Sequence, residues 1–200
     1  MRSDVTARSE RWIQVQESSP PAARELWNTE GNPTPKHEEE LSTWLKGRLE
    51  DDLSIGGRVI GRELEIRPNS TGKGRGESVD LAVFAPVGTE VEGAATASVM
   101  IEVKGCWHSD VNSAMRSQLA DRYLTGTTTH GIYVVFWFAA DAWDRSDHRR
   151  RRCTGDTQRL RDALVQQEQA LAANTRATVR SFVIDASLPA GGAARRVRRL

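Results

Sequence analysis

The hydrophobic positions of the chain recur with two different periods, which predict where its helices and strands lie. Between residues 36 and 53, apolar side chains recur every three or four residues, at Leu41, Trp44, Leu45, Leu49 and Leu53. This spacing places them on one face of an α-helix. A similar pattern predicts a second amphipathic helix over residues 156–173. A third helix is expected over residues 110–124, with Ser109 as its N-cap.

Shorter segments alternate between apolar and polar residues and predict strands. Residues 58–68, 78–86 and 98–105 follow this pattern, and they form an antiparallel meander if neighbours pair in order. Residues 130–138, HGIYVVFWF, form an almost continuous apolar run. Such a run is typical of a strand that is buried on both faces. Residues 178–188 predict a last strand.

The predicted order is helix, three strands, helix, strand, helix, strand. It indicates an α/β domain over residues 36–188, with a mixed central sheet flanked by helices. Residues 1–35 contain SSPP and GNPTP and little periodicity, so we expect a leader or linker. Residues 189–200 are expected to form a basic C-terminal tail.

Composition narrows the class of protein. The chain has 200 residues, 38% of them hydrophobic, with no run of eighteen apolar residues and no apolar core of a signal peptide near its start. We therefore expect a soluble protein that resides in the cytoplasm and does not bind membranes. Cys106 and Cys153 match no CxxC spacing, so the sequence predicts two free thiols.

Charge is divided unevenly along the chain. Residues 1–144 hold 15 Lys and Arg against 22 Asp and Glu, whereas residues 145–200 hold 13 against 5. The two parts therefore carry net charges of −7 and +8. The densest basic run consists of Arg149, Arg150, Arg151 and Arg152. Such runs are typical of phosphate-binding surfaces, and the alternative is a solvated Arg-rich surface.

Acidic and basic side chains interrupt the second and third predicted strands. Because strand side chains alternate, Glu102 and Lys104 share one face, and Asp80 projects away from the apolar face of its own strand. If the two strands are neighbours, these three side chains converge. Two carboxylates at close range repel each other unless a cation lies between them, and oxygen ligands suit Mg²⁺ or Mn²⁺. The alternative is an exposed charge pair of little energetic weight.

The chain contains far more Arg than Lys, so the lysine at position 104 indicates a specific role for this side chain. Only 4 of the 28 basic residues are Lys, so a position that needed merely a positive charge would more often hold Arg. A compact ammonium can contact a single water or phosphoryl oxygen, which the forked guanidinium does less readily.

These residues resemble the PD-(D/E)XK nuclease superfamily. Its motif is an acid on one strand followed by (D/E)-x-K on the next, here Asp80 and, after 21 residues, Glu102-Val103-Lys104. The resemblance covers roughly residues 36–138 and implies the restriction-endonuclease-like αβββαβ core. It also implies that Asp80, Glu102 and the Val103 carbonyl bind Mg²⁺ or Mn²⁺ and that Lys104 serves the attacking water. No Pro precedes Asp80, a common variation.

The resemblance further implies a site-facing Glu on the first helix. Three candidates stand in a row, and helical spacing favours Glu38, which shares the buried face with Leu41 and Leu45. Glu40 is the second choice, and Glu39 is expected to face solvent. Gln118 on the following helix is carried over as a catalytic or DNA-facing polar residue, although Arg122 replaces the Tyr that many relatives have four residues later.

The resemblance implies a magnesium-dependent deoxyribonuclease. The sequence shows no zinc-finger or recognition-helix motif, so we expect cutting without intrinsic sequence specificity. Such domains occur on large bacterial multidomain proteins, some of them thought to act in defence against foreign DNA. Lys73 and Arg75 of the GKGRG turn, together with the four-arginine run at 149–152, are the expected contacts to nucleic acid. RNA is the alternative substrate, and a larger chain or a homodimer the expected assembly. The alternative function is a non-catalytic nucleic-acid-binding or regulatory module on the same fold.

Overall fold

The protein is a mixed α/β protein built around a five-stranded mixed sheet. The computed structural model describes residues 20–53, 58–67, 77–87, 95–125 and 128–188. Its sheet has the strand order β3-β4-β5-β6-β7, where β3, β4 and β5 are antiparallel and β5, β6 and β7 are parallel. These strands are β3 (Val59–Arg67), β4 (Glu77–Val87), β5 (Ala95–Gly105), β6 (His130–Trp137) and β7 (Thr178–Asp185).

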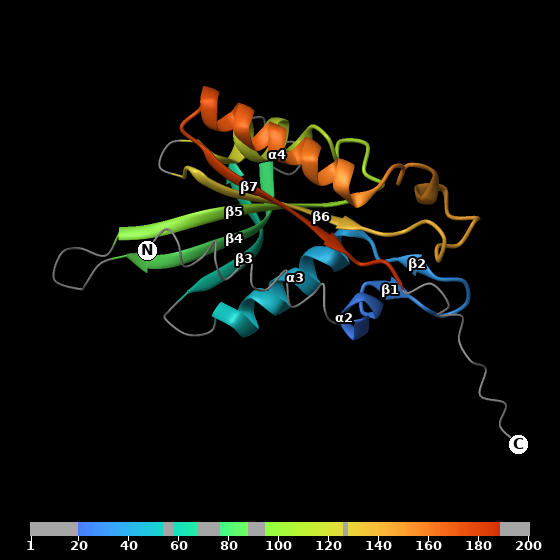
Figure 1. The fold of residues 1–200 in the computed structure, drawn as a ribbon. Coiled ribbons are helices and arrows are strands. Elements are labelled where there is room, and N and C mark those ends of the chain that lie inside the picture. The colour runs from blue at the N-terminus through green and yellow to red at the C-terminus, as the bar shows by residue number, and fades with distance from the viewer. Residues whose placement is uncertain (1–19, 54–57, 68–76, 88–94, 126–127, 189–200) are drawn as a thin grey trace, which may run out of the picture.

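Helices cover the two faces of this sheet. Figure 1 shows α3 (Glu38–Leu53) on one side and α4 (Thr157–Asn174) on the other. Trp44 of α3 packs edge-on against Phe136 of β6, with the ring centroids 5.9 Å apart. On the opposite face, a Cβ added to Gly131 would collide with Leu119 and Leu124, so η1 (Met115–Tyr123) lies directly against β6 there. The sheet is therefore the middle layer of three.

The predicted elements agree closely with those observed. The antiparallel meander is confirmed, with Leu81 opposite Ile101 in β4 and β5. The apolar run HGIYVVFWF forms β6, which is buried over nearly its whole length because strands flank it and helices cover both its faces. The helices predicted at residues 36–53 and 156–173 form within two residues of those bounds.

The expected N-cap of the middle helix was wrong. Ser109 does not cap a helix; its Oγ donates to the carboxylate of Asp110. The backbone N–H of Asp110 is taken by His108 Nδ1, and a series of turns carries the chain to η1. In η1 the N–H groups reach back five residues, as the bond from Leu124 N to Leu119 O illustrates, so it is a π-helix.

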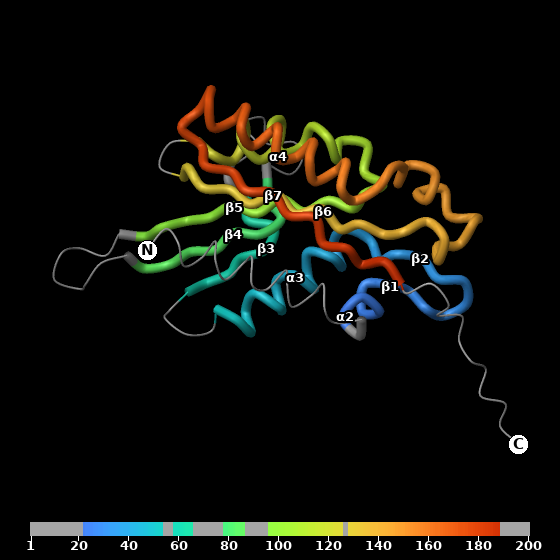
Figure 2. Tube along the Cα trace, in the orientation of Figure 1, coloured from blue at the N-terminus to red at the C-terminus, as the bar shows by residue number. Residues whose placement is uncertain are grey.

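Part of the segment that we assigned to a leader or linker packs onto the domain. Residues 20–35 contain α2 (Pro20–Arg24), β1 (Trp27–Asn28) and β2 (Thr34–Pro35). Leu26 and Trp27 are buried, and the Trp27 indole N–H donates to Ala186 O just beyond β7, at 2.7 Å. Figure 2 shows this first part of the chain beside the end of β7. Residues 1–19 and the predicted tail at 189–200 lie outside the described residues.

Cys106 and Cys153 form a disulfide, so the expectation of two free thiols was wrong. The two Cα atoms are 5.2 Å apart although 47 positions separate the residues in sequence. Cys106 directly follows β5 and Cys153 follows η2 (His148–Arg151), and folding brings these two ends together. The spacing argument failed because it tests local pairs, whereas this pair is made by tertiary structure.

The disulfide also affects the expected cellular compartment. Structural disulfides persist in oxidising compartments and are rare in a reducing cytosol. The cytoplasmic location therefore stays a prediction, and the disulfide weighs against it. Among the described helices, none combines the length and the apolar character that crossing a bilayer requires.

We expect Cys153→Ala to lower the free energy of unfolding. The disulfide closes a loop across 47 residues, and the entropy that this removes from the unfolded chain corresponds to about 4 kcal/mol. Urea unfolding of the variant, compared with the oxidised wild type, measures the loss. Wild-type protein treated with a reductant is the matched control and should approach the variant. Equal midpoints for the variant and the oxidised protein would contradict the stabilising role.

Candidate active site

The candidate site forms where β4 and β5 separate. Leu81 and Ile101 are the last residues paired between the two strands on this side. Asp80 and Glu102 lie directly beyond them. The Asp80 carboxylate accepts a hydrogen bond of 2.8 Å from the backbone N–H of Val103. A side chain thus satisfies a donor of β5 at the point where the neighbouring strand leaves it. The structure places Asp80 beside the segment of β5 that carries Glu102, and the roles assigned to the two residues stay predictions.

Glu102 and Lys104 form an ion pair in the interior. They lie two residues apart on one face of β5, and the Lys104 ammonium donates to the Glu102 carboxylate. Only 3% of Glu102 and 7% of Lys104 are exposed. The alternative of a solvated pair on an open sheet face is therefore wrong. Water is excluded from these charges, so their interaction is much stronger than that of a surface pair.

The first residue of α3 completes the cluster. Glu38 Oε1 accepts a hydrogen bond of 2.8 Å from the backbone N–H of Gly105, one residue beyond Lys104. Glu39 is exposed. Glu40 instead turns back along the helix end, where its Oε2 accepts from His37 N at 3.1 Å. Of the three candidates, the structure thus brings Glu38 to the end of β5, and its role in the site stays a prediction.

Burial and neighbouring negative charges raise the pKa values of the carboxyl groups in this cluster. Burial, followed by the negative charge of Asp80, raises the pKa of Glu102 to about 7 despite its contact with Lys104. Burial likewise raises the pKa values of Asp80 and Glu38. For Lys104, burial lowers the pKa, but the surrounding carboxylates outweigh it and the net shift is upward. The lysine therefore acts as a permanent cation among acids that resist ionisation.

The charge balance of the cluster fits a divalent cation. Three carboxylates, from Glu38, Asp80 and Glu102, face one ammonium, which leaves a charge of −2 when all are ionised. Carboxylate oxygens are the donors that Mg²⁺ and Mn²⁺ prefer. In the arrangement of the described residues, however, no three His, Cys, Asp or Glu side chains are gathered as a metal site. Lys104 and the Val103 N–H each engage one of the carboxylates instead.

Gln118, Lys73 and Arg75 are not brought to the cluster by the described structure. Gln118 is half-buried on η1, and no hydrogen bond among the described residues joins it to Asp80, Glu102 or Lys104. Lys73 and Arg75 lie outside the described residues. Their assigned roles stay predictions.

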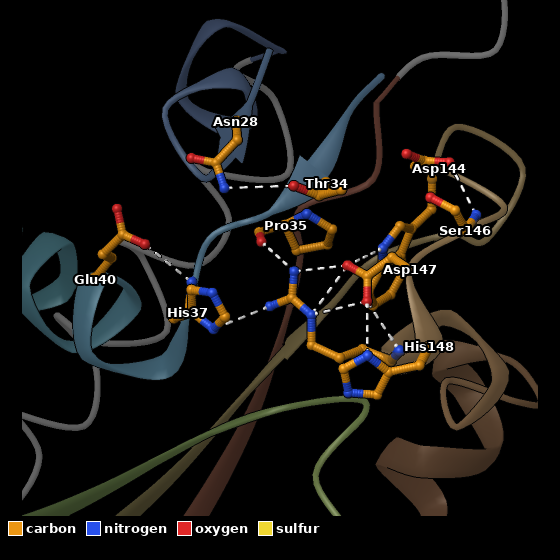
Figure 3. A network of polar contacts seen from close by, with 11 residues as sticks. Asn28, Thr34, Pro35, His37, Glu40, Asp144, Ser146, Asp147 and His148 are labelled. Atoms are coloured by element: carbon orange, nitrogen blue, oxygen red, sulfur yellow. Dashed lines mark hydrogen bonds and ion pairs between the residues drawn. The ribbon is translucent and has the colours of Figure 1, made fainter. Parts of the chain in front are cut away.

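The arginine run divides into residues with different environments. Arg149 is largely buried and binds Asp147 at 2.7 Å and Pro35 O at 2.9 Å, while its guanidinium stacks 4.9 Å from the centroid of Trp107. Figure 3 shows Asp147 beside Pro35 in this network. Burial raises the pKa of Asp147, but hydrogen bonds from Arg149 and Trp143 bring it down to about 2. Arg149 therefore holds the loop after β6 against β2.

The rest of the run is more accessible. Arg150 donates through Nε to Ala140 O at 2.8 Å and is half-buried, whereas Arg151 and Arg152 are exposed. The disulfide ties the next residue, Cys153, to the end of β5. Arg151 and Arg152 therefore belong to a segment that the disulfide fixes to Cys106, two residues beyond Lys104.

Sequence reasoning missed Tyr133 as a neighbour of the cluster. Tyr133 lies opposite Glu102 in the pairing of β5 with β6, so the two side chains share a face. Its hydroxyl donates to Val111 O at 2.8 Å. The pKa of Tyr133 is raised, mainly by burial and secondly by the negative charge of Glu102. The available signal was a tyrosine inside an apolar strand, where a buried hydroxyl requires a partner.

The chain was compared with known proteins of three kinds. No family model matches it, and neither the curated proteins nor the solved structures provide a match. The case for a function therefore depends on the residues and geometry described above.

We expect Glu102→Gln to alter how stability depends on pH. The pKa of Glu102 is about 7 in the fold, against 4.5 as its ordinary value, so the folded state binds the proton more tightly. The stability contributed by this proton is full below the ordinary pKa and is lost as pH rises through about 7. At about pH 8 the variant should therefore be more stable than wild type by a few kcal/mol, with a much smaller gain at about pH 5.

Thermal unfolding at the two pH values measures this difference. Glu39→Gln is the matched control, because it removes a carboxylate from the exposed side of the same site-bearing helix. A gain for Glu102→Gln that is equal at both pH values would contradict a strongly perturbed carboxyl.

Proposed function

We propose that the protein is a magnesium-dependent deoxyribonuclease of the PD-(D/E)XK type. The observation that carries the proposal is the gathering of Asp80, Glu102 and Lys104 at the separation of two neighbouring strands, with Glu38 from the preceding helix. A merely structural ion pair needs one acid and one base. The two additional, partly buried carboxylates of Asp80 and Glu38 cost stability, which supports a catalytic use.

The order of elements supports the same family. From α3 to β7 the chain runs helix, three antiparallel strands, helix, strand, helix, strand. The first six of these elements correspond to the αβββαβ core of restriction-endonuclease-like proteins. The acids stand on the second and third strands, as the motif requires. Fold alone does not imply function, so the proposal also needs the chemistry of the cluster.

The proposed cofactor is Mg²⁺, or Mn²⁺ in its place. Asp80, Glu102 and the backbone carbonyl of Val103 would hold it, and their charge balance with Lys104 favours a divalent ion. When bound, the ion would polarise a phosphoryl oxygen and make a water molecule more acidic. Glu38 would complete the acidic side of the site.

Lys104 has a distinct part in this proposal. Its pKa is raised, so its ammonium stays charged at neutral pH. It would therefore orient the attacking water and offset the charge that develops on the phosphoryl group, rather than remove a proton. Asp80 and Glu102 would act on the phosphate through the bound ion, and Lys104, which lies against Glu102, would contact it directly.

The basic C-terminal part supports a polyanionic substrate. Residues 145–200 carry a net charge of +8 and residues 1–144 carry −7, so attraction to DNA must come mainly from the former. Arg151 and Arg152 are exposed there. We propose cutting without intrinsic sequence specificity and, by the same resemblance, a role in bacterial defence as part of a larger chain or a homodimer. RNA stays the alternative substrate.

The experiment that tests this function uses the purified chain with supercoiled plasmid and linear duplex DNA. Cutting with Mg²⁺ and none with EDTA is the expected result, and cutting of the closed circle would identify an endonuclease. Binding to DNA without cutting under any of these conditions would favour the alternative of a non-catalytic nucleic-acid-binding or regulatory module. The absence of both cutting and binding would refute the proposal.

We expect Lys104→Ala to lose at least about 100-fold in cutting rate, since it removes a charge aimed at the reacting phosphate. DNA binding measured by gel shift should change little. Lys104→Arg should restore little activity, because a planar fork cannot replace a compact ammonium at the same position. A wild-type rate for Lys104→Ala would remove this residue from the mechanism.

The exposed and buried arginines should behave differently. Replacing Arg151 and Arg152 together by Gln should flatten the slope of log affinity against log salt by about 0.9 for each phosphate that the protein no longer neutralises. Stability should not change. Arg149→Gln should instead lower the free energy of unfolding by about 2 kcal/mol, because it removes the guanidinium from Asp147 and leaves that carboxylate with only Trp143 and a backbone N–H as donors. An unchanged salt slope in the double variant would make Arg151 and Arg152 a solvated surface.

A further inference from the structure

His108 lies beside the proposed site, in a tight turn directly after β5. Its backbone N–H donates to Gly105 O at 2.9 Å, which closes the turn. Its ring Nδ1 accepts the backbone N–H of Asp110 at 3.0 Å. Because Nδ1 is an acceptor, the ring proton of the neutral imidazole is on Nε2.

The proton-bearing edge of His108 faces Glu38. The distance from His108 Nε2 to Glu38 Oε2 is 3.8 Å. The other carboxylate oxygen of Glu38 accepts from Gly105 N at 2.8 Å. Both oxygens of Glu38 thus face N–H groups of one four-residue turn. The contact with Gly105 is a hydrogen bond, whereas the contact with His108 is longer than one.

The turn itself is held firmly in place. The N–H of Cys106 donates to Phe136 O at 2.9 Å, and its sulfur is bonded to Cys153. The Trp107 ring lies under Gly105, so close that an added Cβ would come within 2.4 Å of it. Arg149 stacks on the same ring. Because these contacts fix the backbone before it, His108 is presented to Glu38 from a rigid support.

We propose that His108 is a positioning residue, which holds the Glu38 carboxylate toward Asp80 and Glu102 through its Nε2 proton. This inference rests on the proposed function and deepens it. Without His108, Glu38 would keep only the Gly105 bond and could rotate away from the cluster. Contacts of this kind are often long before substrate binds and shorten in the reacting complex.

Two substitutions separate the role of Nε2 from that of the turn. His108→Asn keeps an acceptor for the Asp110 N–H near the position of Nδ1, but its shorter side chain places the amide N–H groups short of the position of Nε2. His108→Gln places an amide N–H close to the position of Nε2. We expect His108→Asn to lower kcat about 10- to 100-fold, the range typical of groups that orient a functional ligand, with little change in KM. His108→Gln should restore most of the loss. Equal losses in both variants would overturn the proposal.

A double-mutant cycle tests whether His108 acts through Glu38. If it does, His108→Asn should cost little further activity in a Glu38→Gln protein, because the group that it positions is already changed. If the two losses multiply, the residues act independently and the proposal is wrong. His108→Asn paired with Glu39→Gln is the matched control, and there the full loss should remain.

A spectroscopic measurement distinguishes failure of this inference from failure of the proposed function. The imidazole ¹⁵N resonances of the protein, with His108 assigned from the His108→Gln variant, report which ring nitrogen carries the proton. We expect the proton on Nε2 in wild type and a changed Nε2 resonance in Glu38→Gln. This result would support the contact even if the protein cut no nucleic acid. A proton on Nδ1, or identical His108 spectra in both proteins, would overturn it.

Discussion

The packing of three acids around a single base is the constraint on which the site depends. Glu102 and Lys104 are buried and neutralise each other, but the partly buried Asp80 and Glu38 remain as further negative groups beside them. Backbone N–H groups of Val103 and Gly105 meet these two carboxylates, so the end of β5 supplies the polar contacts that water would otherwise supply. These bonds lower the pKa values of both acids, yet burial outweighs them. The fold therefore tolerates this charge without fully compensating it.

This constraint explains why the fold and the central residues could be predicted from sequence. A strand that carries Glu102 and Lys104 on one face must give these charges partners, and the alternation of β4 places Asp80 where the strands separate. Helical spacing distinguished Glu38 from Glu39 and Glu40 because only one of three consecutive positions can face the sheet. The placement of these residues could be predicted because it depends on a local period and on neighbouring strands.

Other features depend on contacts that no local pattern records. The bond between Cys106 and Cys153 joins the end of β5 to the end of η2 across 47 positions. Trp27 lies in a segment that contains several prolines, and it is buried because its ring packs against Phe138 and Trp143 and its indole N–H donates to Ala186 O. Arg149 belongs to a uniform basic run, and composition could not reveal that Asp147 and Trp107 remove it from solvent. In each case the partner is distant in sequence or the composition is uninformative.

The disulfide joins the acidic part of the chain, residues 1–144, to the basic part, residues 145–200. Cys106 belongs to the acidic part, and Cys153 belongs to the basic part, directly after the arginine run. The covalent bond therefore holds Arg151 and Arg152 near the strand that carries Glu102 and Lys104, where the negative field of the first 144 residues would otherwise repel a polyanion. Arg149 adds a second attachment through Asp147 and the ring of Trp107. One turn after β5 thus anchors both the basic run and the side chain that faces Glu38, so a change in this turn should affect the proposed DNA binding and the geometry of the cluster together.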